Sequence, residues 1–266
     1  MSIIVSTIWC YRDAMAIVLI TGTSTGIGRA CAELFTARGD RVYGGSRKPD
    51  VRSDESVTSA VSDILAREGR IDIVINNAGI AFAGAVEDTS IAEAKEQFEV
   101  NFFGALRVCK AVLPAMRAQR SGYIVNISSI AGLVAVPYQG LYSASKFALE
   151  GLSESLRMET RHLGVKIVLV EPGDHRTALT QNRHKAAASE SYRERFERAA
   201  KRMEKDEQNG PDPAGVAKLV GRIVNTPTPR LRYTVGPAPE RLMVWLKRWK
   251  PYWVVEAIMK NYYGSR

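Results

Sequence analysis

The sequence contains little cysteine, and this scarcity excludes several classes of cross-linked or metal-stabilised protein. Only Cys10, Cys31 and Cys109 occur among 266 residues. Their number is odd and none has the short spacing of a metal-binding or disulfide-forming pair, so neither a disulfide framework nor a metal site is predicted. Cys31 and Cys109 fall within apolar helical patterns, and we expect both to be small core residues of a cytoplasmic protein.

A long hydrophobic run is also missing. Residues 2–9 are apolar but too short to cross a bilayer, and no basic segment precedes them, so neither a transmembrane helix nor a secretory signal is predicted. A clear strand pattern begins only after Met15. We therefore expect residues 1–15 to be an appendage to the fold, or the product of a start site placed too early.

Acidic residues are fewer than basic ones, 28 against 37, which leaves a formal net charge of +9. The excess is greatest over residues 193–205 and 241–250, and acidic residues interrupt the first of these stretches. Binding to nucleic acid would need a more concentrated basic face, so we interpret the charge mainly as solvated helix surface and predict no nucleic-acid partner.

Short apolar runs alternate with helical patterns along most of the chain, which has no repeats. Strands are expected at residues 16–20, 41–46, 71–75, 122–127, 165–170 and 232–236, and helices at 27–39, 55–67, 93–116, 141–163 and 213–223. This alternation predicts an α/β fold, a single-domain Rossmann-like doubly wound parallel sheet. We assign residues 16–238 to this domain, with a substrate lid at 174–211 and an amphipathic tail at 239–266.

A glycine-rich turn, Thr21-Gly22-x-x-x-Gly26-x-Gly28, joins the first strand to the first helix. Glycines let the backbone turn tightly and approach a pyrophosphate, and a helix N-terminus offers free amides and partial positive charge. An ordinary glycine-rich turn is the alternative. The position after the second strand, where an NAD site carries a carboxylate, holds Ser46 and Arg47. This favours NADP over NAD, because a guanidinium can pair with a 2′-phosphate.

Few residues separate Arg47 from the helix that begins near Glu55. A parallel crossover needs about a dozen residues or more, so the chain has no room for a further helix and strand there. We therefore expect the third strand of the usual arrangement, and the helix before it, to be missing or stunted.

The strongest chemical signal is a tyrosine and a lysine four residues apart, Tyr142 and Lys146. On a helix they share one face, about one turn apart. A nearby ammonium lowers the pKa of a phenol, so the pair could exchange a proton with a substrate oxygen. The same spacing also fits a packed tyrosine beside a solvated lysine. The glycine turn, residues 76–79, Ser129 and residues 172–173 all follow carboxyl ends of predicted strands, where such sheets bind ligands.

Together these segments resemble the short-chain dehydrogenase/reductase family. The resemblance covers roughly residues 16–179 and rests on motifs in the family's order, with Ser129 thirteen residues before Tyr142. The motifs are the glycine turn, Asn76-Asn77-Ala78-Gly79, Asn101, Ser129, Tyr142-x-x-x-Lys146 and Pro172-Gly173. Within this family, Ser46-Arg47 and residues 232–236 are similar to the branch that acts on steroids, retinoids and other lipophilic alcohols and ketones.

The resemblance implies a residue role for each motif. Tyr142 would be the general acid or base, Lys146 would lower its pKa and hold the nicotinamide ribose, Ser129 would bind the substrate oxygen, and Asn101 would support a water linked to Lys146. The cofactor-binding set would be Gly22, Ser24, Gly26, Ile27, Gly28, Arg47, Asp50, Asn77, Ala78, Gly79, Tyr142, Lys146, Pro172, Gly173 and Thr177.

We therefore expect an NADP-dependent oxidoreductase that transfers a hydride between nicotinamide and a lipophilic alcohol or ketone. A catalytically impaired nucleotide-binding or regulatory protein of the same fold is the alternative. The family implies a homodimer or homotetramer. The tail combines aromatic and basic residues, which fits either a membrane-surface helix or, as we favour, packing on the domain or on a second subunit. His175 departs from the family pattern and could be a substrate contact, an exposed residue or part of loop packing.

Overall fold

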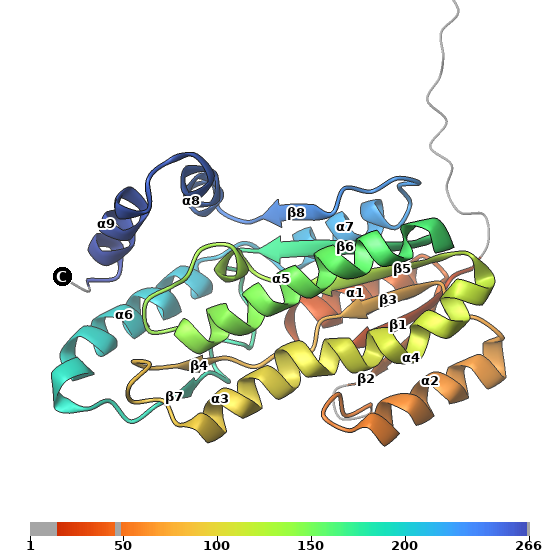
Figure 1. Cartoon of the computed structure of the whole chain (residues 1–266), viewed down its shortest axis with the longest axis horizontal. Coiled ribbons are helices and arrows are strands. Elements are labelled where there is room, and N and C mark those ends of the chain that lie inside the picture. Colours follow the sequence, from red (N-terminus) through yellow and green to blue (C-terminus); the bar gives the residue numbers. More distant parts are fainter. Residues whose placement is uncertain (1–14, 46–48, 265–266) are drawn as a thin grey trace, which may run out of the picture.

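The computed structural model describes residues 15–45 and 49–264, and a six-stranded parallel sheet forms its centre (Figure 1). The strand order is β2-β1-β3-β5-β6-β8, so the winding direction reverses between β1 and β3. The strands are β1 Ile17–Thr21, β2 Arg41–Gly45, β3 Ile73–Asn76, β5 Gly122–Ile127, β6 Val165–Pro172 and β8 Arg232–Val235. The predicted doubly wound parallel sheet is confirmed, and ligands of such sheets bind where the order reverses.

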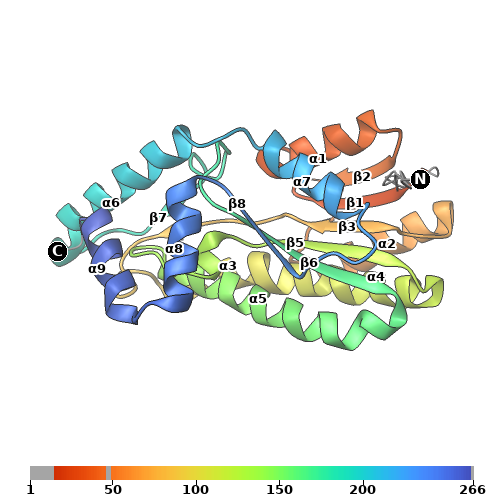
Figure 2. The same ribbon diagram turned by 90° about the horizontal axis from the view of Figure 1, so that it is seen from above.

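Helices cover both faces of the sheet because the strand side chains alternate between two apolar clusters. Val18 and Ile20 of β1 join one cluster, and Ile17 and Leu19 join the other. Helices α1 (Gly26–Ala37) and α7 (Ala214–Ile223) lie on the first face. Helices α2 (Asp54–Glu68), α4 (Gly104–Gln119) and α5 (Gly140–Thr160) lie on the second (Figure 2). Cys31 and Cys109 are buried core residues, as predicted.

The edge of the sheet at β2 agrees with the predicted loss of a strand. β2 pairs with β1 alone in the described residues, and residues 49–53 lead into α2 without forming another strand. α2 begins after Ser53, whose hydroxyl accepts a hydrogen bond from the backbone N–H of Ser56. In the described residues, this edge of the sheet has no further strand between β2 and α2.

The single helix predicted over residues 93–116 is interrupted by one π-helical segment. The chain forms α3 (Ile91–Phe98), then a π-helical turn over Glu99–Phe103, and then α4. A capping box between Ser90 and Glu93 starts α3. The turn lies at Asn101, which is polar and 2% exposed. Such turns widen the helix locally and re-aim side chains, a change that hydrophobic spacing does not reveal.

The remaining elements lie at the end of the molecule toward which the strands point (Figures 1 and 2). β4 (Phe82–Ala83) pairs in parallel with β7 (His184–Lys185), and α6 (Glu190–Gln208) follows. Helices α8 (Ala238–Trp249) and α9 (Tyr252–Tyr262) are separated by Lys250 and Pro251. Over residues 15–45 and 49–264, no helix is long and apolar enough to span a membrane.

Candidate active site

The glycine turn brings its backbone close to the end of β3. Gly22 and Gly26 have φ of +70° and +56°, values that favour glycine. A Cβ on Gly28 would overlap the carbonyl oxygen of Gly22 and Nδ2 of Asn77. The tight turn predicted from the motif is therefore present and Gly28 packs within it, whereas its approach to a pyrophosphate stays a prediction.

The N-terminus of α1 has the features of an anion site. Thr25 precedes the helix but makes no side-chain capping hydrogen bond, and the first turn contains no acidic residue. Its amides and the positive end of the helix dipole thus remain available to a pyrophosphate. The cavity beside it is lined by Gly22, Ser24, Gly26 and Ile27. These residues therefore fit the phosphate end of a nicotinamide dinucleotide.

Asn77 ties the glycine turn to the end of β3. Its Nδ2 donates to the carbonyl oxygens of Thr21 and Gly22 at 3.0 and 2.8 Å. The Thr21 hydroxyl in turn accepts from the backbone N–H groups of Asn77 and Ala78, each at 3.0 Å. Ala78 and Gly79 line the same cavity. Four hydrogen bonds thus fix the wall where the resemblance placed the cofactor.

At the expected adenine end, Asp50 lines the cavity but is engaged by Arg52. Arg52 Nε and Nη2 donate to the two carboxylate oxygens at 3.0 and 2.9 Å, and this interaction lowers the pKa of Asp50. Arg52, which no sequence motif indicated, also lines the cavity. Arg47, the residue expected to read the 2′-phosphate, lies outside the described residues.

Tyr142 and Ser129 meet at the centre of the cavity. Tyr142 projects from α5, is 9% exposed and packs against Ala81 and Ala131. The Ser129 hydroxyl lies near this phenol, where it favours the phenolate, and it donates to the Pro172 carbonyl oxygen at 3.4 Å. The Ser129 oxygen also accepts from the backbone N–H of Ala131 at 3.1 Å, which fixes its position just after β5. The two hydroxyl groups predicted from distant motifs are thus brought together.

Lys146 and Asn101 lie behind this pair. Lys146 Nζ donates to the carbonyl oxygen of Ile127 at 2.9 Å and lies 5.8 Å from the Tyr142 ring centroid. The Asn101 amide brackets Ile80, accepting from its N–H at 2.9 Å and donating to its carbonyl oxygen at 3.0 Å. It also donates to the Ser145 hydroxyl at 3.1 Å. Asn101 therefore supports the cavity wall without lining it, whereas Lys146 lines it.

Burial dominates the protonation of the central pair. It raises the pKa of the Tyr142 phenol to about 12, although the neighbouring Ser129 hydroxyl and the charge of Arg183 act in the opposite direction. Burial also lowers the pKa of the Lys146 ammonium to about 8, which the Glu150 carboxylate partly offsets. Tyr142 is therefore protonated at neutral pH in the protein alone. The expected lowering of its pKa by Lys146 stays a prediction.

The cavity that joins these groups has a volume of about 920 Å³. It extends from the glycine turn past Tyr142 to the lid and the C-terminal tail. Pro172, Gly173 and Thr177 line it as expected, and Thr177 packs against Gly26. His175 also lines it, but is only 5% exposed, and its Nδ1 lies 2.9 Å from the Gly173 carbonyl oxygen. This excludes an exposed His175 and leaves loop packing or a substrate contact.

The far end of the cavity contains charged residues that no motif indicated. Arg183 forms a buried ion pair with Glu207, which also accepts a hydrogen bond from the Thr180 hydroxyl. Glu240 of α8 accepts from the backbone N–H of Asp174 at 3.0 Å. Burial and the neighbouring Glu240 raise the pKa of Asp174 to about 8. These residues lie in segments 174–211 and 239–266, outside the recognised motifs, so only the structure brings them to the Tyr142 site.

Comparison with known proteins identifies the family. Residues 45–188 match the model of the short chain dehydrogenase family. A 3-ketodihydrosphingosine reductase of Bacteroides thetaiotaomicron is 41% identical over 265 residues, a match that covers 94% of this chain and 98% of the relative. This second match includes the region of the glycine turn, which the family model does not cover.

Solved structures agree with this assignment. A short-chain dehydrogenase from Streptomyces avermitilis superposes with a TM-score of 0.79 at 31% identity, covering 90% of this chain and 97% of that one. The structure of ElxO with NADP bound gives a TM-score of 0.70 at 27% identity, covering 84% and 97%. The chain therefore belongs to the short-chain dehydrogenase family and is an NAD(P)-dependent oxidoreductase.

Proposed function

We propose that the protein uses NADPH to reduce a long-chain, lipophilic ketone to the alcohol. The observation that carries this proposal is the pair of neighbouring hydroxyl groups, Ser129 and Tyr142, in the wall of the cavity of about 920 Å³. The glycine turn lines the same cavity. A carbonyl placed at the pair would therefore lie between two hydroxyl donors and the cofactor end of the site.

The chain's residues divide the proton chemistry between them. Tyr142, protonated because burial raises its pKa, donates its proton to the carbonyl oxygen as the C–O double bond is reduced. Ser129 donates a hydrogen bond to the same oxygen and holds it in place. Lys146 stabilises the phenolate left behind, and Asn101 supports the water through which the proton returns. The nicotinamide, when bound, supplies the hydride to the carbonyl carbon.

NADP is the favoured cofactor. The residues that would hold it are the glycine turn, the α1 N-terminus, Asn77 to Gly79, and Pro172 to Thr177. Ser46 and Arg47 follow β2 in the sequence, and no carboxylate stands there to repel a 2′-phosphate. Arg47 would form the ion pair with that phosphate.

The substrate class follows from the opposite end of the cavity. Leu179, Met203, Met243 and Met259 provide an apolar lining, and Arg183 and Glu207 provide a polar patch. This combination suits an amphiphile with a hydrocarbon chain and a polar head. The relative named as a 3-ketodihydrosphingosine reductase supports the same class, and its named substrate is the first one to test. As in the family generally, we propose that the protein forms a homodimer or homotetramer through α4 and α5. We also propose that it acts in the cytoplasm.

The test is NADPH consumption by the purified protein with 3-ketodihydrosphingosine, a short-chain ketone and no ketone. We expect turnover with the long-chain ketone, much less with the short one, and a lower KM for NADPH than for NADH. An Arg47→Ala variant should lose most of the cofactor preference while keeping its kcat, with Arg67→Ala as the matched exposed control. Tight NADPH binding without turnover of any ketone would instead support the catalytically impaired alternative.

A further inference from the structure

The C-terminal hairpin, helices α8 and α9, exposes an unusual amount of apolar surface. Thirteen large apolar side chains are exposed among residues 15–45 and 49–264, and seven of them lie in this hairpin. The seven are Leu242, Trp245, Trp249, Tyr252, Trp253, Ile258 and Tyr262. The aromatic ones are well exposed, with Trp249 at 63% and Trp253 at 69%. Packing on the domain, which we favoured from the sequence, therefore leaves this face uncovered.

Five of the exposed residues lie within twelve positions of one another, on one stripe of α8 and at the start of α9. Leu242, Trp245 and Trp249 follow the i, i+3, i+7 spacing that places side chains along one stripe of a helix. Tyr252 and Trp253 come immediately after the bend at Pro251, close to Trp249 in the chain. We call these five residues the aromatic face. The opposite side of the hairpin contacts the protein, where Val255 is 3% exposed and Lys247 donates to the Leu133 carbonyl.

Cations accompany the aromatic face. Arg241, Arg248 and Lys250 are exposed, and the Arg248 guanidinium lies 5.5 Å from the Trp249 ring centroid. The two acidic residues of the hairpin are engaged elsewhere, because Glu240 accepts from the Asp174 backbone and Glu256 pairs with Lys260. Indole rings and basic side chains on one amphipathic surface are the combination that binds the interface of an anionic bilayer.

We propose that the aromatic face docks the protein on the surface of an anionic lipid bilayer, with α8 and α9 lying in the interface. A second copy of the chain suits this surface less well. In a symmetric dimer the same basic patch of both copies would meet, and the two acidic residues of the hairpin are engaged elsewhere, so the face offers no carboxylate to pair with these cations. An anionic membrane provides an apolar layer for the rings and opposite charge for Arg241, Arg248 and Lys250.

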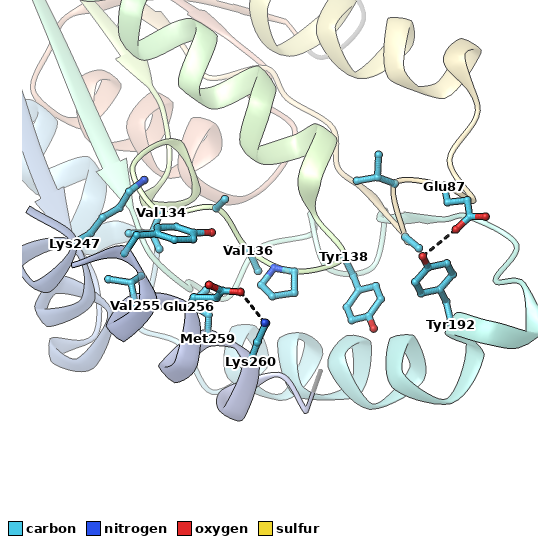
Figure 3. Close-up of a pocket in the computed structure, with 15 residues that line it drawn as sticks. Glu87, Val134, Val136, Tyr138, Tyr192, Lys247, Val255, Glu256, Met259 and Lys260 are labelled. Atoms are coloured by element: carbon cyan, nitrogen blue, oxygen red, sulfur yellow. Dashed lines mark hydrogen bonds and ion pairs between the residues drawn. The ribbon is translucent and has the colours of Figure 1, made fainter. Parts of the chain in front are cut away.

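The hairpin lies beside a second cavity, which relates membrane docking to substrate entry. A second cavity, of about 760 Å³, lies between α9 and residues 134–138 (Figure 3). It shares Val134, Val136 and Met259 with the cavity that contains Tyr142. Tyr252, a member of the aromatic face that is 68% exposed, also lines it. The second cavity thus lies beside the aromatic face and shares part of its wall with the active-site cavity, which places it on the route that a lipophilic substrate from the bilayer would follow.

The test uses the tryptophans of the full-length protein. The chain has four, Trp9, Trp245, Trp249 and Trp253, so a Trp9→Phe variant emits from the hairpin alone. Vesicles of phosphatidylglycerol and phosphatidylcholine should shift its emission to the blue, protect it from aqueous quenchers and carry the protein with them on flotation. A variant with Trp245→Ser and Trp249→Ser should lose at least about tenfold in vesicle partitioning. Met158→Ser, which alters an exposed residue of α5, should not.

A second set of variants tests the contribution of the basic residues to vesicle binding. Arg241→Gln and Arg248→Gln should each lower partitioning about fivefold, and Arg222→Gln on α7 should leave it unchanged. Equal partitioning of the native protein onto phosphatidylcholine vesicles would overturn the proposal, as would the absence of any emission shift. A blue shift that grows with protein concentration in the absence of lipid would show that a second copy covers the face, and would also overturn it. Because the assay needs no substrate, its result is independent of the proposed reaction.

Discussion

The region around the glycine turn and the C-terminal hairpin differ in how the chain secures them. β1 is buried along its whole length, and Asn77 and Thr21 join it to β3 by four hydrogen bonds. In contrast, α8 has no fully buried residue and α9 has only Val255. Yet both line the cavity that contains Tyr142. The region that would hold the cofactor is thus well buried and hydrogen-bonded. The hairpin, which would meet the substrate, has few buried residues.

This contrast fits the different tasks of the two ends. The groups that bind a dinucleotide must already be in position, because a misplaced cofactor slows the reaction that follows binding. A lipophilic substrate must instead enter and leave, and elements with few buried contacts open at the lowest free energy. We therefore expect the hairpin to move relative to the sheet more readily than the glycine turn does.

The largest expected effect is on the free energy of unfolding, which should differ between a core substitution and a hairpin substitution. Phe35 of α1 is 0% exposed in the core, so Phe35→Ala should lower the free energy of unfolding by about 3–5 kcal/mol. Trp249→Ser, at a larger side chain in the hairpin, should change it by less than about 0.5 kcal/mol. Denaturant unfolding of both variants measures the difference. Comparable losses would mean that the hairpin is as firmly packed as the core.

A substitution in the glycine turn should affect cofactor binding next most strongly. The Cβ of Gly28→Ala would overlap Gly22 and Asn77, and such overpacking typically costs about 1–3 kcal/mol. NADPH affinity should fall about 10- to 100-fold. Gly215→Ala is the matched control, because a Cβ there meets no atom within 4 Å. Fluorescence titration with NADPH tests both, and unchanged affinity for Gly28→Ala would contradict the tight turn.

The smallest predicted effect is a pH dependence of stability that originates in the sheet. Burial raises the pKa of Glu171 in β6 to about 7. Because the folded state then holds a proton that the unfolded state has released, stability should fall as pH rises from about 4.5 to 7. Glu171→Gln should weaken this dependence and raise stability at pH 8 by about 1–2 kcal/mol. Thermal unfolding at pH 5 and 8 measures it. A native protein more stable at pH 8 would contradict the sign.

The sequence predicted the rigid region far better than the loose one. Apolar runs located every strand of the central sheet within about two residues, and the lack of room after Arg47 predicted the exposed edge at β2. Spacing could not predict the π-helical turn at Asn101, whose side chain makes hydrogen bonds to Ile80 and Ser145, residues distant in the sequence. Nor could it place Arg183, Glu207 and Glu240 in the cavity, since their positions depend on how the lid and hairpin fold back over the sheet.

The account depends most on Tyr142 as the proton donor. The direct measurement is single-turnover oxidation of NADPH by native protein and Tyr142→Phe, with a long-chain ketone and with NADPH affinity determined on the same samples. Loss of the phenol proton should slow reduction by about 10²- to 10⁴-fold while NADPH affinity and unfolding temperature remain nearly unchanged. Equal single-turnover rates for the two proteins would contradict the assignment of Tyr142 and the proposed mechanism.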